Sequence, residues 1–215
     1  MKLSKYIDHT LLKADASIEA LKKLCQEAIE YDFKSVCVNP CNITLCKELL
    51  AGSDVLVCTV IGFPLGQMST EAKVFEAKDA IEKGAQEVDM VLNIGRLKDG
   101  KLDFVTDEIA QIKKACGSIT LKVIIETCLL TDEEKINACQ CIMNAGADFV
   151  KTSTGFSTAG ATFDDVALFK KIVGDKCYIK AAGGVRSHED MLKMIELGAN
   201  RIGTSSGTKL IEKGE

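Results

Sequence analysis

The chain is organised around the segment Phe149-Val150-Lys151-Thr152-Ser153-Thr154-Gly155. It begins with apolar and β-branched residues, a pattern typical of a buried strand. It then passes through a lysine into hydroxyl side chains and a glycine, the composition of a loop that can approach a ligand closely. A lysine at the end of a buried strand is costly to desolvate unless it has a use. Lys151 is therefore either an amine nucleophile or a lysine whose ammonium reaches solvent beyond the strand.

Short apolar runs alternate with longer amphipathic runs over the whole chain. The expected strands, with the loops that follow the last three, are residues 6–10, 35–38, 55–61, 87–92, 121–127, 149–155, 178–184 and 201–207. The expected helices are residues 17–31, 40–50, 70–83, 103–115, 131–146, 162–173, 187–198 and 208–212. Capping-box spacing from Thr131 to Glu134 and a C-cap glycine at Gly84 support two of these helices. Residues 93–95 are expected to form a turn.

About eight consecutive strand–helix units predict an α/β protein with a single (β/α)8 TIM barrel. A doubly wound open sheet is the alternative, but it usually has fewer strands and a Gly-x-Gly-x-x-Gly turn after the first one, which this chain lacks. No linker, low-complexity tract or charge block divides the chain, so residues 1–215 are expected to form one domain.

The composition is that of an ordinary soluble globular protein, with 47% hydrophobic and 27% charged residues. A formal net charge of −4 gives no reason to expect nucleic acid as a partner. No apolar run approaches the ~20 residues of a membrane span, and residues 1–5 do not open a signal peptide. We therefore expect no membrane partner and a cytoplasmic location.

Ten cysteines are scattered over expected strands and helices, which suits small buried side chains in a reducing compartment. The chain has no Cys-x-x-Cys pair, and its only two histidines, His9 and His188, are far apart in sequence, so we expect no metal site. Cys37 and Cys41 flank a strand end. Contact with a functional site is an alternative there, but core packing is the prediction for both.

Charged side chains stand inside expected strands, where Val, Ile or Leu would be ordinary. They are Asp8, Asp89, Lys122, Glu126, Lys151 and Lys180. Because the chemistry of such a barrel sits at the carboxyl ends of its strands, we expect these side chains to point into one bowl and to pair there. Lys151 and Lys180 lie on consecutive strands, and a nearby cation makes an amine easier to deprotonate, which activates it as a nucleophile. Asp89 is placed to move protons, with Asp8 and Lys122 holding the network in position.

Glycine and hydroxyl residues form a second group, in the loops after the last three expected strands. They are Gly155, Gly183, Gly184, Ser205 and Ser206. Loops after the last strands of a barrel, with a short extra helix, commonly bind phosphate through backbone N–H groups. Glycines also simply turn the chain, so it is the three loops together that predict a phosphate site.

Four motifs can be compared with known families. They are Val150-Lys151-Thr152-Ser153-Thr154-Gly155-Phe156, Ile179-Lys180-Ala181-Ala182-Gly183-Gly184-Val185-Arg186, Glu87-Val88-Asp89-Met90-Val91 and Ile7-Asp8-His9-Thr10. All four resemble the motifs of deoxyribose-phosphate aldolases. The resemblance extends from residue 7 to about residue 207, and the two lysine motifs are much more specific than a glycine loop.

The resemblance implies a class I aldolase that reversibly cleaves 2-deoxy-D-ribose 5-phosphate to acetaldehyde and D-glyceraldehyde 3-phosphate, with no metal or other cofactor. It implies that Lys151 forms the Schiff base, that Lys180 eases deprotonation of that amine, and that Asp89 serves a proton shuttle. The iminium then acts as an electron sink when the carbon–carbon bond breaks. The phosphate is expected at Gly155, Gly184, Ser205 and Ser206.

One departure from the family concerns proton transfer. The family often carries a C-terminal tail with a tyrosine that assists this step, whereas the last tyrosine here is Tyr178 and the sequence ends at Glu215. Either the protein has no such tail or this sequence does not include it, so this departure bears on the efficiency of the proton step and not on the Schiff-base chemistry. Barrels of this size commonly associate, so a homo-oligomer is expected, with a dimer as the first guess.

Two alternatives remain open at this point. A phosphosugar epimerase or isomerase on the same barrel would use Asp89 or Glu126 in acid–base chemistry and leave Lys151 to stabilise charge. A catalytically inactive barrel would bind phosphorylated ligands as a regulator. The pairing of Lys151 with Lys180 favours the aldolase over both.

Overall fold

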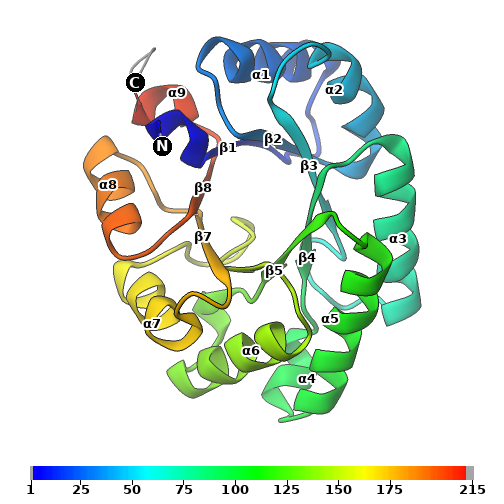
Figure 1. Ribbon diagram of the computed structural model, residues 1–215, viewed down its shortest axis with the longest axis vertical. Helices are drawn as coiled ribbons and strands as arrows, with labels where there is room; N and C mark the ends of the chain where they lie inside the picture. The colour runs from blue at the N-terminus through cyan, green and yellow to red at the C-terminus, as the bar shows by residue number, and fades with distance from the viewer. Residues whose placement is uncertain (1, 212–215) are drawn as a thin grey trace.

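The computed structural model describes residues 2–211, and these contain a closed barrel of parallel strands surrounded by helices (Figure 1). The strands are β1 (Ile7–Leu11), β2 (Ser35–Val38), β3 (Leu56–Ile61), β4 (Glu87–Val91), β5 (Thr120–Ile124), β6 (Phe149–Lys151), β7 (Tyr178–Ala182) and β8 (Arg201–Thr204). Each strand pairs with the next along the chain, and β1 pairs with β8. This closure confirms the TIM barrel and excludes the doubly wound sheet, which would leave two open edges.

The helices lie outside the barrel and connect its strands. They are α1 (Ile18–Glu30), α2 (Ile43–Leu49), α3 (Thr70–Lys83), α4 (Ile94–Lys98), α5 (Leu102–Cys116), α6 (Asp132–Asn144), α7 (Phe163–Val173), α8 (His188–Glu196) and α9 (Gly207–Leu210), with 3-10 turns η1 (Leu3–Tyr6), η2 (Pro40–Asn42) and η3 (Thr127–Leu129). Five of the helices begin after a hydroxyl side chain that accepts the backbone N–H three residues further on. These caps are Ser17, Ser69, Thr131, Thr162 and Ser187. Each satisfies one N–H group that the helix itself leaves unpaired.

The fifth strand is shorter than expected. It was expected to extend to residue 127, but β5 ends at Ile124. Glu126 has a φ of 56°, in the left-handed region that a non-glycine residue adopts only where other contacts hold it. Its carboxylate accepts hydrogen bonds from the backbone N–H and the hydroxyl of Thr154. The assignment of Glu126 to a strand was therefore wrong, because these contacts hold it in the loop layer above the strands.

Two helical segments also differ from expectation. The expected turn at residues 93–95 is the start of α4, because the Asn93 side chain accepts the N–H of Arg96 and caps a helix there. Residues 40–50 form η2 followed by α2 rather than one continuous helix. The expected end of the last helix, Glu212, lies outside the described residues.

The wall of the barrel separates an apolar layer from a charged interior. Along β4, Val88 and Met90 join the hydrophobic core under the helices, while Glu87 and Asp89 alternate with them and point inward. The strand register places Asp89 beside Lys122, Lys151 beside Lys180, and Lys180 beside Arg201. Gly203 on β8 leaves room for this interior, because a Cβ there would lie 3.0 Å from the Lys180 side chain.

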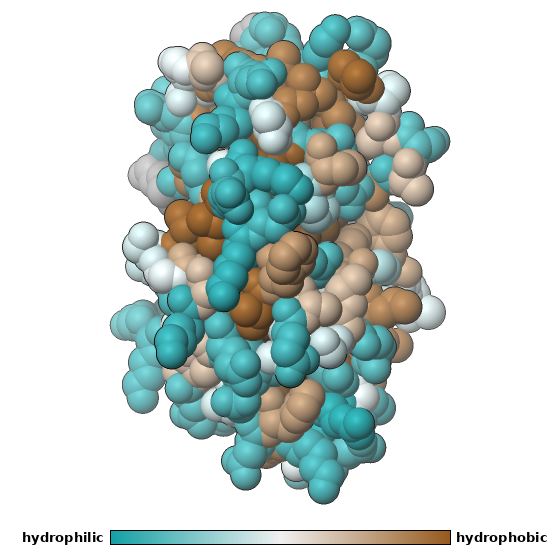
Figure 2. All heavy atoms as spheres, turned by 90° about the vertical axis from the view of Figure 1, so that its right-hand side faces the viewer, coloured by the Kyte–Doolittle hydropathy of each residue, from teal (hydrophilic) through white to brown (hydrophobic). Residues whose placement is uncertain are grey.

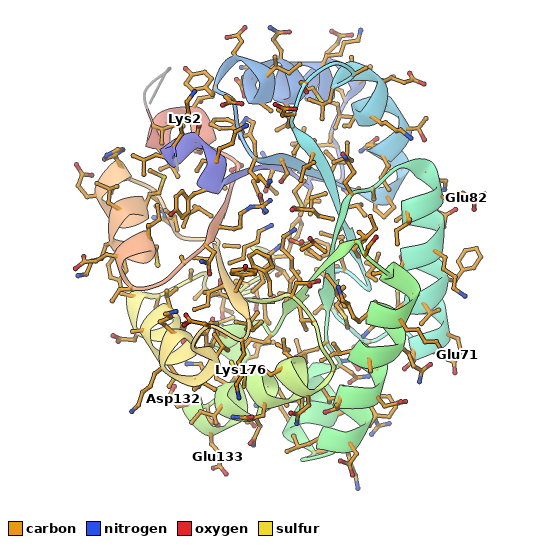
Figure 3. The ribbon with its side chains drawn as sticks, viewed as in Figure 1. Lys2, Glu71, Glu82, Asp132, Glu133 and Lys176 are labelled. Carbon is orange, nitrogen blue, oxygen red and sulfur yellow. The ribbon has the colours of Figure 1, made fainter. Side chains whose placement is uncertain are left out.

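Several charged side chains on the helices extend away from the barrel. Glu71, Glu82 and Glu133 extend outward from α3 and α6 in Figure 3. Figure 2 shows the face that carries α3, where hydrophobic side chains lie among the hydrophilic ones. Within residues 2–211, no helix combines the length and apolar character needed to cross a membrane.

Candidate active site

The carboxylate of Asp89 is the centre of the charged interior. Its Oδ2 accepts hydrogen bonds from Lys151 Nζ at 2.7 Å and Lys180 Nζ at 2.8 Å. Its Oδ1 accepts from Lys122 Nζ at 2.8 Å and from Cys58 Sγ at 3.2 Å. Asp89 is fully buried, and Lys151 is only 3% exposed. The structure therefore brings together the three lysines that the sequence singled out, around one carboxylate group.

A second set of contacts lies beside this centre and is built on Arg201. Its Nε lies 2.8 Å from Asp8 Oδ1, and its Nη1 and Nη2 lie 2.9 and 2.7 Å from the two carboxylate oxygens of Glu87. Asp8 Oδ2 forms an ion pair of 2.5 Å with Lys180 Nζ, and Glu87 Oε2 accepts from Lys122 Nζ at 2.8 Å. The two sets of contacts are therefore one continuous network of buried charges.

This network determines the charge of its members. Burial alone would raise the pKa of Asp89, but the charges of Lys122, Lys151 and Lys180 outweigh it and hold that pKa well below the ordinary value. Burial lowers the pKa of Lys180, but the charges of Asp8 and Asp89 more than compensate and raise it above the ordinary value. The pKa of Lys122 is likewise held high, against burial, by Asp89 first. At neutral pH Asp89 is thus ionised, and Lys122 and Lys180 are protonated.

The sequence predicted that the cation of Lys180 acts directly on the amine of Lys151. The structure instead places Asp89 Oδ2 in contact with both amines. A carboxylate in this position partly cancels the repulsion between two ammonium groups. It also gives a short path along which a proton can pass from one amine to the other.

A cavity of about 620 Å³ opens above this network, beyond the carboxyl ends of β6, β7 and β8. Of the five catalytic candidates, Lys151 is the one found on the cavity wall among the described residues. The five residues expected to bind phosphate all line it as well: Gly155, Gly183, Gly184, Ser205 and Ser206. Lys13 and Arg186 add two exposed basic side chains to the same wall. The cavity therefore places a buried amine at one point and a set of backbone and hydroxyl donors around it.

The glycines of these loops have conformations that other residues rarely adopt. Gly155, Gly183 and Gly184 have φ values of 83°, 73° and 82°. A Cβ on Gly183 would lie 3.2 Å from Gly160 Cα, and one on Gly184 would lie 3.3 Å from Ala161 O. Glycine is required here because the loop after β7 turns in the left-handed region while packed against the loop after β6. Because a side chain at these positions would be costly, the loops contain glycines, and those glycines made the loops recognisable in the sequence.

Comparison with known proteins identifies the family. A model of the DeoC/LacD family aldolases matches residues 2–211. The chain belongs to that family. It is 61% identical over 212 residues to a protein named deoxyribose-phosphate aldolase from Finegoldia magna, covering 99% of this chain and 100% of that protein. It is also 61% identical to one from Brevibacillus brevis, covering 98% of this chain and 96% of that protein.

Solved structures of the family have the same fold. The structure titled "QR15, an Aldolase" superposes with a TM-score of 0.94 at 42% identity, over 98% of this chain and 94% of that one. The tetrameric deoxyribose phosphate aldolase from Aeropyrum pernix superposes with a TM-score of 0.90 at 35% identity, over 97% and 88%. The expected resemblance is thus confirmed, and this DeoC/LacD family aldolase is an enzyme of the carbon–carbon lyase class.

Sequence reasoning missed Arg201 and Glu87, although both lie in expected strands. The candidates were expected at the carboxyl ends of strands, whereas Arg201 and Glu87 are the first residues of β8 and β4. A signal was present, since a charge at the start of a fully buried strand needs a partner as much as one at its end. The tilt and stagger of barrel strands bring the start of one strand level with the middle of others, so both side chains reach the network.

Eight of the ten cysteines are buried as expected, whereas Cys128 is half-buried and one further thiol is exposed. Cys37 is buried in the small apolar cluster with Leu12, Cys58 and Val60, as predicted. Cys41 is exposed, so its predicted place in the core was wrong. The reason is local, because Cys41 lies in the single turn η2, outside the barrel wall.

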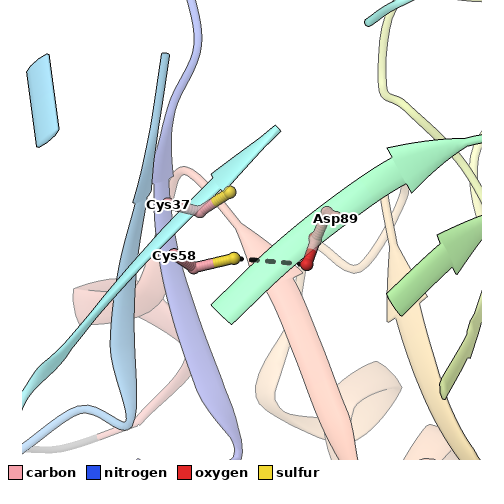
Figure 4. Close-up of side chains that lie close together, drawn as sticks. All are labelled: Cys37, Cys58 and Asp89. Atoms are coloured by element: carbon pink, nitrogen blue, oxygen red, sulfur yellow. Dashed lines mark hydrogen bonds between the residues drawn. The ribbon is translucent and has the colours of Figure 1, made fainter. Parts of the chain in front are cut away.

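Two of these thiols approach Asp89 closely enough to raise the question of a metal. Cys37 Sγ, Cys58 Sγ and an Asp89 oxygen lie within 4.8 Å of one another, in the arrangement shown in Figure 4. The lysines already use both oxygens of this carboxylate, and Lys122 Nζ lies 3.4 Å from Cys58 Sγ. A cation here would have to displace ammonium groups from their counter-ion. We therefore assign these three residues to the charge network and the core, and propose no metal site.

Proposed function

We propose that the chain cleaves 2-deoxy-D-ribose 5-phosphate reversibly to acetaldehyde and D-glyceraldehyde 3-phosphate, and that Lys151 forms the Schiff base. The observation that carries this proposal is the position of Lys151. Its amine is almost fully buried, lies on the wall of the cavity, and is 2.7 Å from the carboxylate of Asp89. An amine that meets a substrate at one side and a proton carrier at the other has what imine chemistry requires.

Imine formation begins with the neutral amine. Its lone pair attacks C1 of the open-chain sugar, and the carbonyl oxygen leaves as water after two proton transfers, which gives a protonated imine. Asp89 is the proposed proton carrier because its Oδ2 contacts both Lys151 and Lys180. Lys180, held protonated by Asp8 and Asp89, supplies a proton at that oxygen.

Cleavage follows from the charge on the imine. A base removes the proton of the C3 hydroxyl, the C2–C3 bond breaks, and its electron pair moves into the iminium to give an enamine. C3 leaves as the aldehyde carbon of glyceraldehyde 3-phosphate. The enamine is then protonated at C2, and water releases acetaldehyde from Lys151. The network of Asp8, Asp89 and Lys122 keeps the amine in place through these steps by holding every partner in a fixed charged contact.

We propose that the phosphate lies against the loops after β6, β7 and β8. Gly155, Gly183 and Gly184 bring the backbone to the cavity without side chains, and Ser205 and Ser206 add hydroxyl donors. Arg186 and Lys13 contribute positive charge on the same wall. Backbone N–H groups and basic side chains together match a dianion.

Borohydride trapping tests the proposed function. Reduction of the protein with sodium borohydride in the presence of acetaldehyde should replace one amine hydrogen with an ethyl group, a net gain of C2H4, and peptide mapping should place the ethyl group on Lys151. The Lys151→Ala variant is the control and should remain unmodified at that site. An isomerase or epimerase forms no imine and would not be trapped. An inactive phosphosugar-binding barrel would not cleave 2-deoxy-D-ribose 5-phosphate. A protein that cleaves the substrate but is never trapped would overturn the Schiff-base assignment.

We propose in addition that the chain acts as a single domain in the cytoplasm and associates as a dimer. Leu65 and Phe75, in and beside α3, are each 70% exposed, and apolar side chains of this size favour burial against a partner. The related Aeropyrum pernix enzyme is described as a tetramer. Light scattering at micromolar concentration tests the assembly, and a mass of one chain would exclude the dimer.

A further inference from the structure

The interior of the barrel holds more positive than negative groups. The members of this charge cluster are at most 5% exposed and contact one another. Among the described residues they comprise the carboxylates Asp8, Glu87 and Asp89 and the basic side chains Lys122, Lys151, Lys180 and Arg201. With every group in its ordinary charged form, one positive charge has no carboxylate of its own. Because an unpaired buried charge is expensive, the cluster is most stable when one basic side chain is neutral.

The contacts show which basic side chain of the cluster is paired least strongly. Three of the four basic groups contact two carboxylates each: Arg201 with Asp8 and Glu87, Lys122 with Glu87 and Asp89, and Lys180 with Asp8 and Asp89. Lys151 contacts Asp89 only, through the oxygen that Lys180 also uses. Lys151 is thus the least strongly paired, and it is the one on the cavity wall.

We propose that Arg201 and Glu87 are positioning residues for the Schiff base, because the balance of charge that they set inside the barrel determines the pH at which Lys151 becomes a free amine. Arg201 does this by occupying carboxylates that would otherwise be free to pair with the lysines. Glu87 acts in the opposite sense, because it supplies a carboxylate that pairs with Lys122 and Arg201. The inference rests on the proposed function, since it concerns the amine that forms the imine.

Other titratable and charged groups face Lys151 and bear on this count. Cys37 on β2 and Cys58 on β3 adjoin Asp89, and burial holds the pKa of Cys58 well above its ordinary value. A hydrogen bond from Cys58 lowers the pKa of Cys37, so that thiol is the other candidate source of negative charge. Lys13 and Arg186 lie on the cavity wall above the amine.

Glu126 is the remaining acid close to the cluster. Its hydrogen bonds go to the backbone and hydroxyl of Thr154, and none of the contacts found within residues 2–211 joins it to a basic group of the cluster. We therefore leave it out of the count. His9, on β1, pairs with Glu27 of α1 on the helix side of the wall.

The experiment measures how trapping of the acetaldehyde imine depends on pH, in the parent and in three variants. Arg201→Met removes the excess charge, so the midpoint of the curve of trapping against pH should move to higher pH. Glu87→Gln increases the excess, so the midpoint should move to lower pH. Each shift should be about one pH unit, as expected for one charge within about 10 Å in a medium of effective dielectric about 20. The double variant restores one excess positive charge and should return to the parental midpoint.

Opposite shifts that cancel in the double variant are specific to a charge count, since loss of packing would lower trapping at every pH. Arg201→Lys keeps the charge and should keep the parental midpoint. Cys37→Ala should also keep it, and a shift as large as that of Arg201→Met would assign the balance to the thiol instead. Circular dichroism checks that each variant is folded. If Arg201→Met does not fold, the proposal is tested by the expected shift of the trapping midpoint to lower pH in Glu87→Gln.

Two failures are distinguishable in this design. A parent protein that is never trapped at any pH would refute the Schiff base itself. A parent that is trapped, with single variants that share its midpoint or that shift in the same direction, would refute only the role of Arg201 and Glu87.

Discussion

Replacing Asp89 with asparagine removes one charge at the centre of the network and changes almost nothing in shape. The carboxylate accepts from the side-chain nitrogens of three lysines at 2.7–2.8 Å and from one thiol, and it is fully buried. Removing one partner of a buried ion pair costs about 3–5 kcal/mol, because the other charge is left uncompensated. We expect Asp89→Asn to lose about that much stability, which corresponds to a fall in Tm of roughly 6–20 °C for a chain of this size.

The pH dependence of this loss follows from the pKa of Asp89. Three lysines hold that pKa well below its ordinary value against the opposing effect of burial. The stabilisation by an ionised Asp89 is therefore fully present above the pKa of about 3.9 in the unfolded chain and is lost as the pH falls toward the folded value. The difference in unfolding free energy between the parent and Asp89→Asn should be constant near neutral pH and shrink below about pH 4.

Urea unfolding followed by circular dichroism measures the stability, and a coupled assay for glyceraldehyde 3-phosphate measures the rate. Loss of the proton carrier should lower kcat by about 10²–10⁴-fold. Asp99→Asn is the matched control, because Asp99 is exposed and pairs with Arg96 at 3.2 Å on the surface. That change should cost less than about 0.5 kcal/mol and leave the rate unaltered. An Asp89→Asn protein within about 1 kcal/mol and tenfold of the parent would refute the reasoning.

Four further outcomes are expected. Lys151→Arg should abolish cleavage in a folded protein, because a guanidinium keeps the charge but forms no imine, and substantial turnover would contradict the covalent mechanism. Lys180→Met should slow cleavage and move the acidic limb of the rate profile to higher pH, whereas an unchanged profile would leave Lys180 a structural role only. Ser206→Ala should raise KM for 2-deoxyribose 5-phosphate by about 10- to 100-fold but not for 2-deoxyribose; an unchanged ratio of kcat/KM between the two sugars would exclude the hydroxyl from the phosphate site. Activity should survive EDTA, and a loss that zinc reverses would require a metal-dependent mechanism.

The architecture and most of the reactive groups could be predicted from the sequence alone. Alternation of short apolar runs with amphipathic ones depends on local periodicity, and about eight such units in succession favour a barrel over a doubly wound sheet, which usually has fewer strands. Lys151 and Lys180 were recognisable because a charge in a buried strand is rare enough to require a reason. The glycine loops were recognisable because their backbone conformations exclude side chains.

Which charges meet depends on the tertiary structure. Asp8 and Arg201 are 193 residues apart in sequence and come together because β1 pairs with β8 and closes the barrel. Arg201 and Glu87 add one charge of each sign to the network, and the excess of one positive charge appears only because Glu126, one of the six charged candidates, contacts Thr154 instead of the lysines. Glu126 leaves its expected strand for a similar reason, since Thr154 holds it from the next loop. Local periodicity specifies how each segment folds, whereas the balance of buried charge depends on contacts between segments that only closure of the barrel creates.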